Sequence, residues 1–312
     1  MLKKSSGAVL LFVLAAALAM STMVLLFQNK SRLYVEVFSN SSRALRINYA
    51  AEAGISIGRE LIKLQREKEL SSFAADRSWP REKTYEFEGL TLNIKVDDEN
   101  SKINPNKIFG EEKGEIVSLQ DSLYKGFFSA MGYSATLRDS LLDWMDEDDI
   151  PRQNGAEAFY YRTAGLPYVP PNKPLYGIEE ISLVRDFTED VLFGEEKEDG
   201  EMEKGLIDFI TLFSDGKINV NTCTPEIFSA MGFTAADIEK ILASRKGKPL
   251  AEGSLISINR EAYIRNRNTI SFKSNFYSVY SEVSGAIGED KKIRAYIYSD
   301  DKKTEILRWS VI

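Results

Sequence analysis

The sequence of 312 residues contains no histidine and only one cysteine. Without histidine there is no Ser-His-Asp triad, no Cys-His pair and no imidazole ligand for a metal. Cys223, being alone, can form neither an internal disulfide nor a zinc cluster built on thiolates. The chain therefore lacks many of the side-chain combinations on which hydrolases and zinc proteins depend.

An excess of positive charge is also missing. The chain has 40 Lys and Arg against 47 Asp and Glu, a net charge of −7. Nucleic-acid-binding proteins normally carry a basic patch, so we expect no nucleic-acid partner. With 43% hydrophobic and 28% charged residues, the composition is otherwise that of a globular protein, long enough for one large or two ordinary domains.

A long apolar run lies near the N-terminus. Residues 8–27 contain no charged side chain. A helix of this length spans roughly 30 Å, the thickness of the hydrocarbon core of a bilayer. Lys3 and Lys4 precede the run, and the positive-inside rule then places the N-terminus in the cytoplasm. We expect a single-pass inner-membrane protein with the bulk of the chain in the periplasm.

Three interpretations of this segment stay open on the residues alone. Ala17-Leu18-Ala19 resembles a signal-peptidase site, although the apolar run continues well beyond it. The segment can also be an ordinary membrane anchor followed by a stalk. The third interpretation is a prepilin leader, residues 1–7, cleaved between Gly7 and Ala8 with the apolar helix retained.

The pattern after the run favours a retained, continuous helix. Residues 28–70 contain no proline, and apolar residues recur there at roughly helical spacing. We therefore predict one helix from Ala8 to about Leu70. Its first half would lie in lipid and its second half would pack on a soluble domain.

Both flanks of the remaining chain show the alternation of β-strands. Residues 84–87 and 90–96 predict a hairpin, and three more strands are predicted after residue 275. We predict an α+β fold in which a pilin-like long N-terminal helix packs on an antiparallel sheet. The sheet and helix would comprise residues 28–97 and 275–312. Residues 98–274 would form a large, mostly helical insertion between strands.

The insertion contains an internal duplication. Lys102-Ile103-Asn104 recurs as Lys217-Ile218-Asn219, and Ser129-Ala130-Met131-Gly132 recurs as Ser229-Ala230-Met231-Gly232. Each glycine precedes a helix start, capped by Ser134 in one copy and by Thr234 with Asp237 in the other. The pattern is typical of helix-hairpin-helix or SAM-like repeats. Because no basic cluster accompanies it, we interpret the repeats as packing units.

Between the repeats lies a dense acidic stretch near residues 143–161. Six carboxylates fall within residues 143–157 beside the single cation Arg152. Clustered carboxylates repel one another without a cation, and Ca²⁺ takes six to eight hard oxygen ligands in flexible geometry. We therefore predict a Ca²⁺ site. The alternatives are a solvated acidic loop and, less consistent with the sequence, a catalytic carboxylate pair.

These residues together resemble a known family. The pattern Asp143-Trp144-Met145-Asp146-x-Asp148-x-x-Pro151-x-x-x-Gly155-Ala156-Glu157-x-x-x-Tyr161, followed by the segment 215–222, is similar to the minor pseudopilin K of type II secretion systems. The resemblance extends from the Gly7 leader to the terminal strands.

The resemblance implies a pilin-like fold with a large helical insertion, bound Ca²⁺ and a place at the tip of a periplasmic pseudopilus. It further implies minor pseudopilins I and J as partners, and a prepilin peptidase that cleaves and N-methylates the chain. The metal site that it implies maps onto Asp146, Asp148 and Glu157. The full predicted set is Asp143, Asp146, Asp148, Asp149, Ile150 and Glu157.

One departure from ordinary pilins has a physical interpretation. Most pilins carry a glutamate at the fifth mature position, where this chain has Phe12. A charge in mid-bilayer costs about 2.5–3.5 kcal/mol, so it is retained only for a partner, in pilins the N-terminal amine of the subunit above. A subunit at the tip has no subunit above it. Phe12 thus fits a capping position.

The sequence therefore predicts a non-enzymatic structural protein that caps or initiates a pseudopilus. The alternative that remains is a membrane-anchored periplasmic binding or adaptor module. A carboxylate-dependent hydrolase is a third class, and it rests on the acidic stretch alone.

Overall fold

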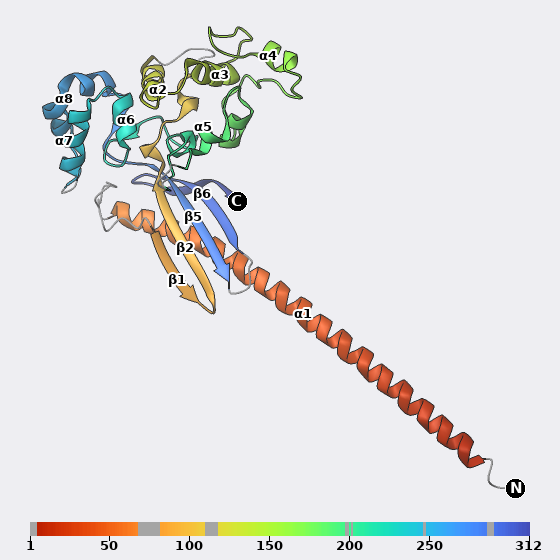
Figure 1. Ribbon diagram of the computed structural model, residues 1–312. Coiled ribbons are helices and arrows are strands. Elements are labelled where there is room, and N and C mark those ends of the chain that lie inside the picture. Colours follow the sequence, from red (N-terminus) through yellow and green to blue (C-terminus); the bar gives the residue numbers. More distant parts are fainter. Residues whose placement is uncertain are drawn as a thin grey trace.

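The fold consists of a long helix, a sheet packed on one end of it and a helical insertion beyond the sheet (Figure 1). The computed structural model describes residues 5–67, 82–109, 118–196, 200, 202–245, 248–285 and 290–312. Residues 1–4, the end of the predicted helix beyond residue 67 and the predicted turn at residues 288–289 lie outside these ranges.

Helix α1 runs without interruption from Ser5 to Glu67. Its N-terminal part projects away from the rest of the fold (Figure 1). Its C-terminal part lies on the sheet and buries the side chains of Ile47, Ala50, Ala51, Ile55 and Ile62. The predicted continuous helix is therefore confirmed within the described residues. Burial of this apolar stripe supplies the stabilisation that fixes α1 on the sheet.

The sheet has five antiparallel strands in the order β1-β2-β5-β6-β7. Their bounds are Glu82–Phe87 (β1), Leu90–Asp98 (β2), Phe276–Gly285 (β5), Lys291–Ser299 (β6) and Thr304–Val311 (β7). In β2 the residues Leu90, Leu92, Ile94 and Val96 are all buried, which is the period-two burial of a strand with one face on the core. The predicted α+β class and the predicted strands are confirmed.

Two glycines let α1 approach the sheet closely. A Cβ atom on Gly54 would overlap the side chain of Ser281, and one on Gly58 would overlap Val279, both on β5. Any larger residue at these positions would push the helix off the central strand.

The insertion leaves the sheet after β2 and returns to it at β5. It contains seven α-helices among the residues described: α2 Ser118–Ala130, α3 Ala135–Met145, α4 Ala158–Thr163, α5 Glu189–Phe193, α6 Pro225–Ala230, α7 Ala235–Arg245 and α8 Glu252–Asn266. Four short 3-10 helices accompany them, η1 Glu99–Ser101, η2 Pro105–Lys107, η3 Ile178–Leu183 and η4 Leu206–Asp208. The insertion buries a hydrophobic core of its own, distinct from the core between α1 and the sheet.

The two predicted helix–turn–helix repeats are present. Gly132 joins α2 to α3 and Gly232 joins α6 to α7, with φ angles of 70° and 83° that favour glycine. The Ser134 hydroxyl accepts a hydrogen bond from the Leu137 amide at 3.3 Å. Thr234 and Asp237 bond reciprocally to each other's amides, as predicted for a capping box. Helices α2 and α6 pack against each other, so the repeats share one core.

A second, two-stranded sheet lies outside the elements predicted from the sequence. In it β3 (Ile218–Asn219) pairs in parallel with β4 (Ile270–Ser271). Two residues are too few to show a period in the sequence, so this pairing is defined by tertiary contacts.

A buried polar network joins the insertion to the sheet. Asp98, the last residue of β2, accepts hydrogen bonds from the hydroxyls of Ser274 at 2.5 Å and Thr222 at 2.6 Å. Asn100 accepts from the backbone amides of Asn275 and Phe276 at 2.9 and 3.0 Å. Burial raises the pKa of Asp98 to about 6, partly offset by these donors. The network ties the first residues of the insertion to its last ones.

The close helix–sheet contact leads to a prediction about stability. Gly58→Leu should lower the free energy of unfolding by about 1–3 kcal/mol, because the side chain has to displace Val279 or shift α1. Gly253→Leu is the control, because a Cβ there meets no atom within 4 Å. Chemical denaturation of both variants measures the difference. Equal effects would contradict the proposed close packing.

Candidate metal centre

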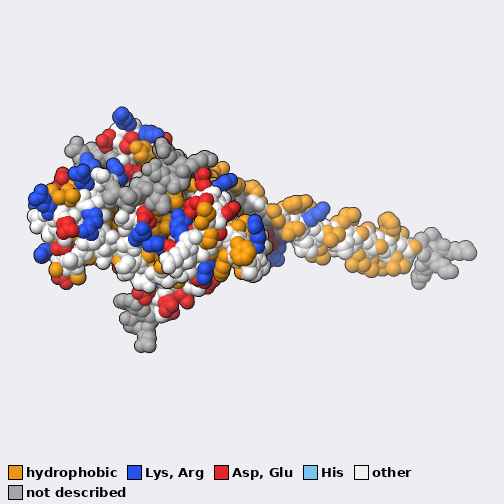
Figure 2. Space-filling view, turned by 90° about the horizontal axis from the view of Figure 1, so that it is seen from above, with side chains coloured by type: hydrophobic (Ala, Val, Ile, Leu, Met, Phe, Trp, Pro, Cys, Tyr) orange, Lys and Arg blue, Asp and Glu red, His pale blue; other side chains and the backbone are white. Residues whose placement is uncertain are grey.

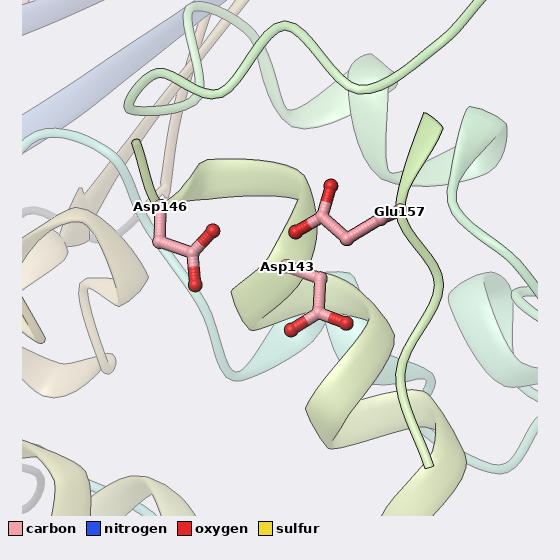
Figure 3. Close-up of side chains that lie close together, drawn as sticks. All are labelled: Asp143, Asp146 and Glu157. Atoms are coloured by element: carbon pink, nitrogen blue, oxygen red, sulfur yellow. The ribbon is translucent and has the colours of Figure 1, made fainter. Parts of the chain in front are cut away.

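Three carboxylates from two separate segments converge in the insertion. Asp143 and Asp146 lie at the C-terminal end of α3, and Glu157 lies immediately before α4. All three residues are buried, and each offers an oxygen within 4.8 Å of the others. Figure 3 shows Asp143 and Asp146 on successive turns of one helix end, with Glu157 reaching toward them from the opposite segment.

The local backbone explains this convergence. A spacing of three residues places Asp143 and Asp146 on one face of α3, and the helix ends at Asp146, whose amide donates to the Leu142 carbonyl at 2.9 Å. The chain then turns back so that Gly155 passes against the Asp143 carboxylate. A Cβ on Gly155 would overlap that carboxylate. Glycine is therefore required for the returning segment to bring Glu157 into place.

Arg152 supplies the positive charge within the cluster. Its guanidinium bonds Asp143 at 2.6 Å and also bonds Asp146, and its backbone amide donates to Asp143 at 3.1 Å. Burial raises the pKa of both aspartates, and the pairing with Arg152 acts in the opposite direction. With every group ionised, three carboxylates and one guanidinium carry a formal charge of −2.

Glu157 is the group that this arrangement leaves uncompensated. Neither of its carboxylate oxygens has a hydrogen-bond partner among the described residues, although both are buried. Burial, together with repulsion from Asp143 and Asp146, raises its pKa to about 8. A carboxyl in this state is neutral at pH 7 unless a cation is supplied.

The donor set fits a hard divalent cation. In the part of the chain that the structure describes, Asp146 Oδ1 and both oxygens of Glu157 are buried without a hydrogen-bond partner, and one carboxylate oxygen from each of Asp143, Asp146 and Glu157 lies within 4.8 Å of the others. Hard oxygen ligands and a local charge of −2 suit Ca²⁺ better than a soft metal, which prefers sulfur or imidazole. These side chains would provide part of the coordination shell of a bound Ca²⁺ ion. Backbone carbonyls and water would complete the usual six to eight ligands.

The structure brings together only part of the set predicted from the sequence. Asp148, Asp149 and Ile150 lie on the exposed loop after α3. The Asp148 carboxylate accepts from the Ile150 amide at 2.8 Å, and the Asp149 carboxylate accepts from Asn172 at 3.2 Å. In this conformation these contacts stabilise the loop, and the coordinating role of the three residues stays a prediction.

Two residues that matter here were not assigned a role from the sequence. From the sequence Arg152 is only a neighbouring cation, whereas in the structure it bonds two of the three carboxylates. Gly155 was noted only as part of the family pattern, whereas it makes room for Asp143. The pair Asn154-Gly155 is a turn signal that could have indicated the tight return of the chain.

The predicted processing and assembly residues lie at the other end of the molecule. Gly7, Ala8 and Phe12 are in the exposed N-terminal part of α1. Within Gly7–Leu64 this helix contains a stretch long and apolar enough to cross a membrane, and none of that stretch is buried in the fold. Figure 2 shows the projecting helix covered mostly by hydrophobic side chains. These features are consistent with a single-pass membrane anchor.

The shifted pKa of Glu157 predicts how stability depends on pH. In the metal-free protein Glu157 holds its proton up to about pH 8, compared with an ordinary value of 4.5 in the unfolded chain. The folded state binds more protons between these values, so its contribution to stability is full below pH 4.5 and is lost as the pH rises to about 8.

Thermal unfolding in EDTA across this pH range tests the prediction. Glu157→Gln should remove this part of the decline in melting temperature, since its side chain cannot ionise. Glu239→Gln, on an exposed position of α7, is the control and should retain it. A parallel decline in the two variants would show that Glu157 does not titrate abnormally.

Comparisons with known proteins agree with this architecture. Residues 101–193, which include the whole carboxylate cluster, match the family described as type II secretion system (T2SS), protein K. The fold is similar to a chain in the crystal structure of the GspK–GspI–GspJ complex from the type 2 secretion system of enterotoxigenic Escherichia coli. The TM-score is 0.65 at 15% sequence identity, over 88% of this chain and 98% of that one. No curated protein sequence matches the chain. The resemblance to protein K of type II secretion systems, predicted from the sequence, is confirmed by the family match and by the shared fold.

Proposed function

We propose that this protein is a minor pseudopilin of a type II secretion system that caps or initiates the periplasmic pseudopilus. The proposal rests on two features found together. One is the exposed, apolar N-terminal part of α1, which we call the rod, and the other is the match of residues 101–193 in the insertion to protein K. The rod supplies the part that packs with other pseudopilin helices, and the insertion supplies the part that distinguishes this subunit. The alternative of an adaptor module has no observation specific to it.

The apolar helix has two successive roles in this proposal. Before assembly, residues 8–27 hold the chain in the inner membrane, with the sheet and the insertion in the periplasm. A prepilin peptidase removes residues 1–7 and methylates Ala8. After assembly the same surface packs against neighbouring helices, where van der Waals contact replaces contact with lipid.

The position of the insertion supports a place at the tip. It lies at the end of the sheet opposite the projecting rod, so it widens the head at the end farthest from the membrane (Figure 1). A subunit stacked above would meet this bulk. Phe12 also agrees with a place at the tip. It is an exposed apolar residue at the position where ordinary pilins carry a glutamate, and that carboxylate is needed only to pair with a subunit above.

The proposed partners are the minor pseudopilins I and J of the same system. The similar solved structure is a complex of three such proteins. The exposed apolar side chains along α1 continue past the membrane segment, with Leu33, Tyr34 and Phe38 all more than half exposed. Contact with other subunits would bury this surface. The role we propose is structural, without a catalytic step.

We also propose that the centre formed by Asp143, Asp146 and Glu157 binds Ca²⁺. A bound cation would compensate the negative charge of ionised Glu157. It would also link the end of α3 to the start of α4, because its ligands come from both segments. Arg152 already compensates two carboxylates, which argues against their use as a catalytic acid and base pair. The site would therefore stabilise the insertion.

Processing at the predicted position is directly measurable. Intact mass and peptide mapping of protein purified from cells containing the secretion system should give a chain that begins at methylated Ala8. An unprocessed Met1 would instead support a simple anchor, and a start near Met20 would indicate export with loss of the rod.

Calcium should raise the melting temperature of the protein. At a hundredfold excess over the dissociation constant, the gain in unfolding free energy is about 2.7 kcal/mol. Asp146→Ala and Glu157→Gln should lose most of the shift, whereas Asp148→Ala, on the exposed loop, should lose less. Asp290→Ala, an exposed residue outside the insertion, is the control. An equal shift in all the variants would exclude the proposed site.

Assembly with the proposed partners tests the function itself. The full-length chain should co-purify with pseudopilins I and J of its own system, and its deletion should reduce secretion and pseudopilus formation. Complementation with a chain that lacks residues 98–274 should restore neither, if the insertion is the feature that defines the tip. Normal secretion in the deletion strain would contradict the proposal.

A further inference from the structure

A groove borders α1 where it leaves the sheet. Its helical wall is formed by residues of α1 between Val35 and Ile47, including Phe38, Arg43 and Arg46. Its other wall is formed by the turn of the β1–β2 hairpin at residues 88–90 and by Gly285. The groove has a volume of about 520 Å³. Val35 and Phe38 are 69% and 74% exposed, so the apolar part of the wall is open to solvent. We refer to this feature as the stem groove, and to residues 28–50 as the stem.

The stem has a charge opposite to that of the rest of the chain. It contains Lys30, Arg32, Arg43 and Arg46 with Glu36 as its one acid, a net charge of +3 that leaves −10 for the other residues. Arg46 pairs with Glu88 at 3.1 Å, both largely exposed. Arg43 has no acidic partner among the described residues. The groove thus combines unburied apolar side chains with one excess positive charge, that of Arg43.

The proposed orientation makes this charge unfavourable during insertion. Lys and Arg are normally scarce on the translocated side close to a membrane segment, where the stem would lie. The four cations therefore oppose the topology that the proposed function requires. A negatively charged group bound after insertion would compensate these cations in the inserted protein.

Distance excludes the membrane surface as the source of that group. Arg43 lies 16 residues beyond Phe27, which is about 24 Å along an upright helix. The headgroup region extends only about 5–8 Å beyond the hydrocarbon core on each side. Phospholipid headgroups are within reach of Lys30 and Arg32 but not of the groove. Another stem of similar charge would be repelled.

We infer that the stem groove docks an acidic, apolar segment on the head of a neighbouring pseudopilin subunit. Its carboxylates would pair with Arg43 and Arg46, and its apolar side chains would cover Val35 and Phe38. The inference rests on the proposed function, because only another pseudopilin subunit would place a head segment at this height. Charge complementarity here would govern both the rate of association and the choice of subunit.

Charge reversal in the groove tests the inference. The full-length chain in nanodiscs of uncharged lipid is titrated with pseudopilins I and J of the same system, at low and high salt. The double variant Arg43→Glu/Arg46→Glu should weaken binding at least about tenfold at low salt and lose most of the salt dependence. Arg59→Glu is the control: it makes one of these charge reversals on an exposed position of α1 away from the groove, and it should bind like the parent.

A second measurement identifies the occupant and does not depend on charge reversal. A photo-reactive amino acid in place of Phe38 should crosslink to an acidic segment of I or J, whereas one in place of Arg59 should not. Changing the crosslinked carboxylate to lysine should restore binding to the double variant. The milder Arg43→Gln/Arg46→Gln variant gives the same comparison if the reversal perturbs folding.

The outcomes separate the two proposals. If the parent chain binds neither I nor J, the proposed function fails and the docking inference fails with it. If the parent binds and the double variant binds equally well with the same salt dependence, only the docking inference is overturned. Crosslinks confined to lipid or to a second copy of this chain would also overturn it.

Discussion

The pairing of β2 with β5 is the constraint on which the rest of the structure depends. These strands are adjacent in the sheet but are separated in sequence by the whole insertion. Asp98 is opposite Tyr277 in their register, so the chain leaves the sheet and returns to it at one place. The insertion can therefore have a core of its own without disturbing the packing of α1 on the sheet.

Buried polar groups make this junction specific. Asp98 and Asn100 bond to Ser274, Asn275 and Phe276, and Asn100 also donates to Asp215 and to the Lys217 carbonyl. A buried carboxylate is costly unless donors compensate it, and three side-chain donors surround Asp98 Oδ2. Hydrophobic contact alone would tolerate many orientations of the two parts. These directional bonds favour one orientation.

Sequence patterns predicted the parts of the fold that repeat with a period. The helical spacing from Ile47 onward, the alternation in β2, β5 and β6 and the capped repeats correspond to elements with one buried face, whereas β7, which its alternation also predicted, has no buried residue. The two-residue strands β3 and β4 and the network around Asp98 have no such period. They depend on contacts between residues more than 50 positions apart, which a single sequence does not reveal.

The candidate metal centre was predictable in composition but not in geometry. A run of acids indicated a cation, and three of the predicted side chains do converge. Which acids face inward depends on where α3 ends and on the path of the returning loop, where Arg152 and Gly155 both contact Asp143. Asp148 and Asp149 belong to the same acidic run in the sequence, yet both are exposed on the loop after α3.

The insertion leaves the sheet at the end of β2 and returns to it at the start of β5, so its size and shape can change independently of the sheet. Because both ends of residues 98–274 meet at neighbouring strands, this part can grow, shrink or be exchanged as a cassette, and the rod and sheet keep their geometry. A filament subunit could thereby acquire a new terminal shape without altering the lattice of helices that it joins.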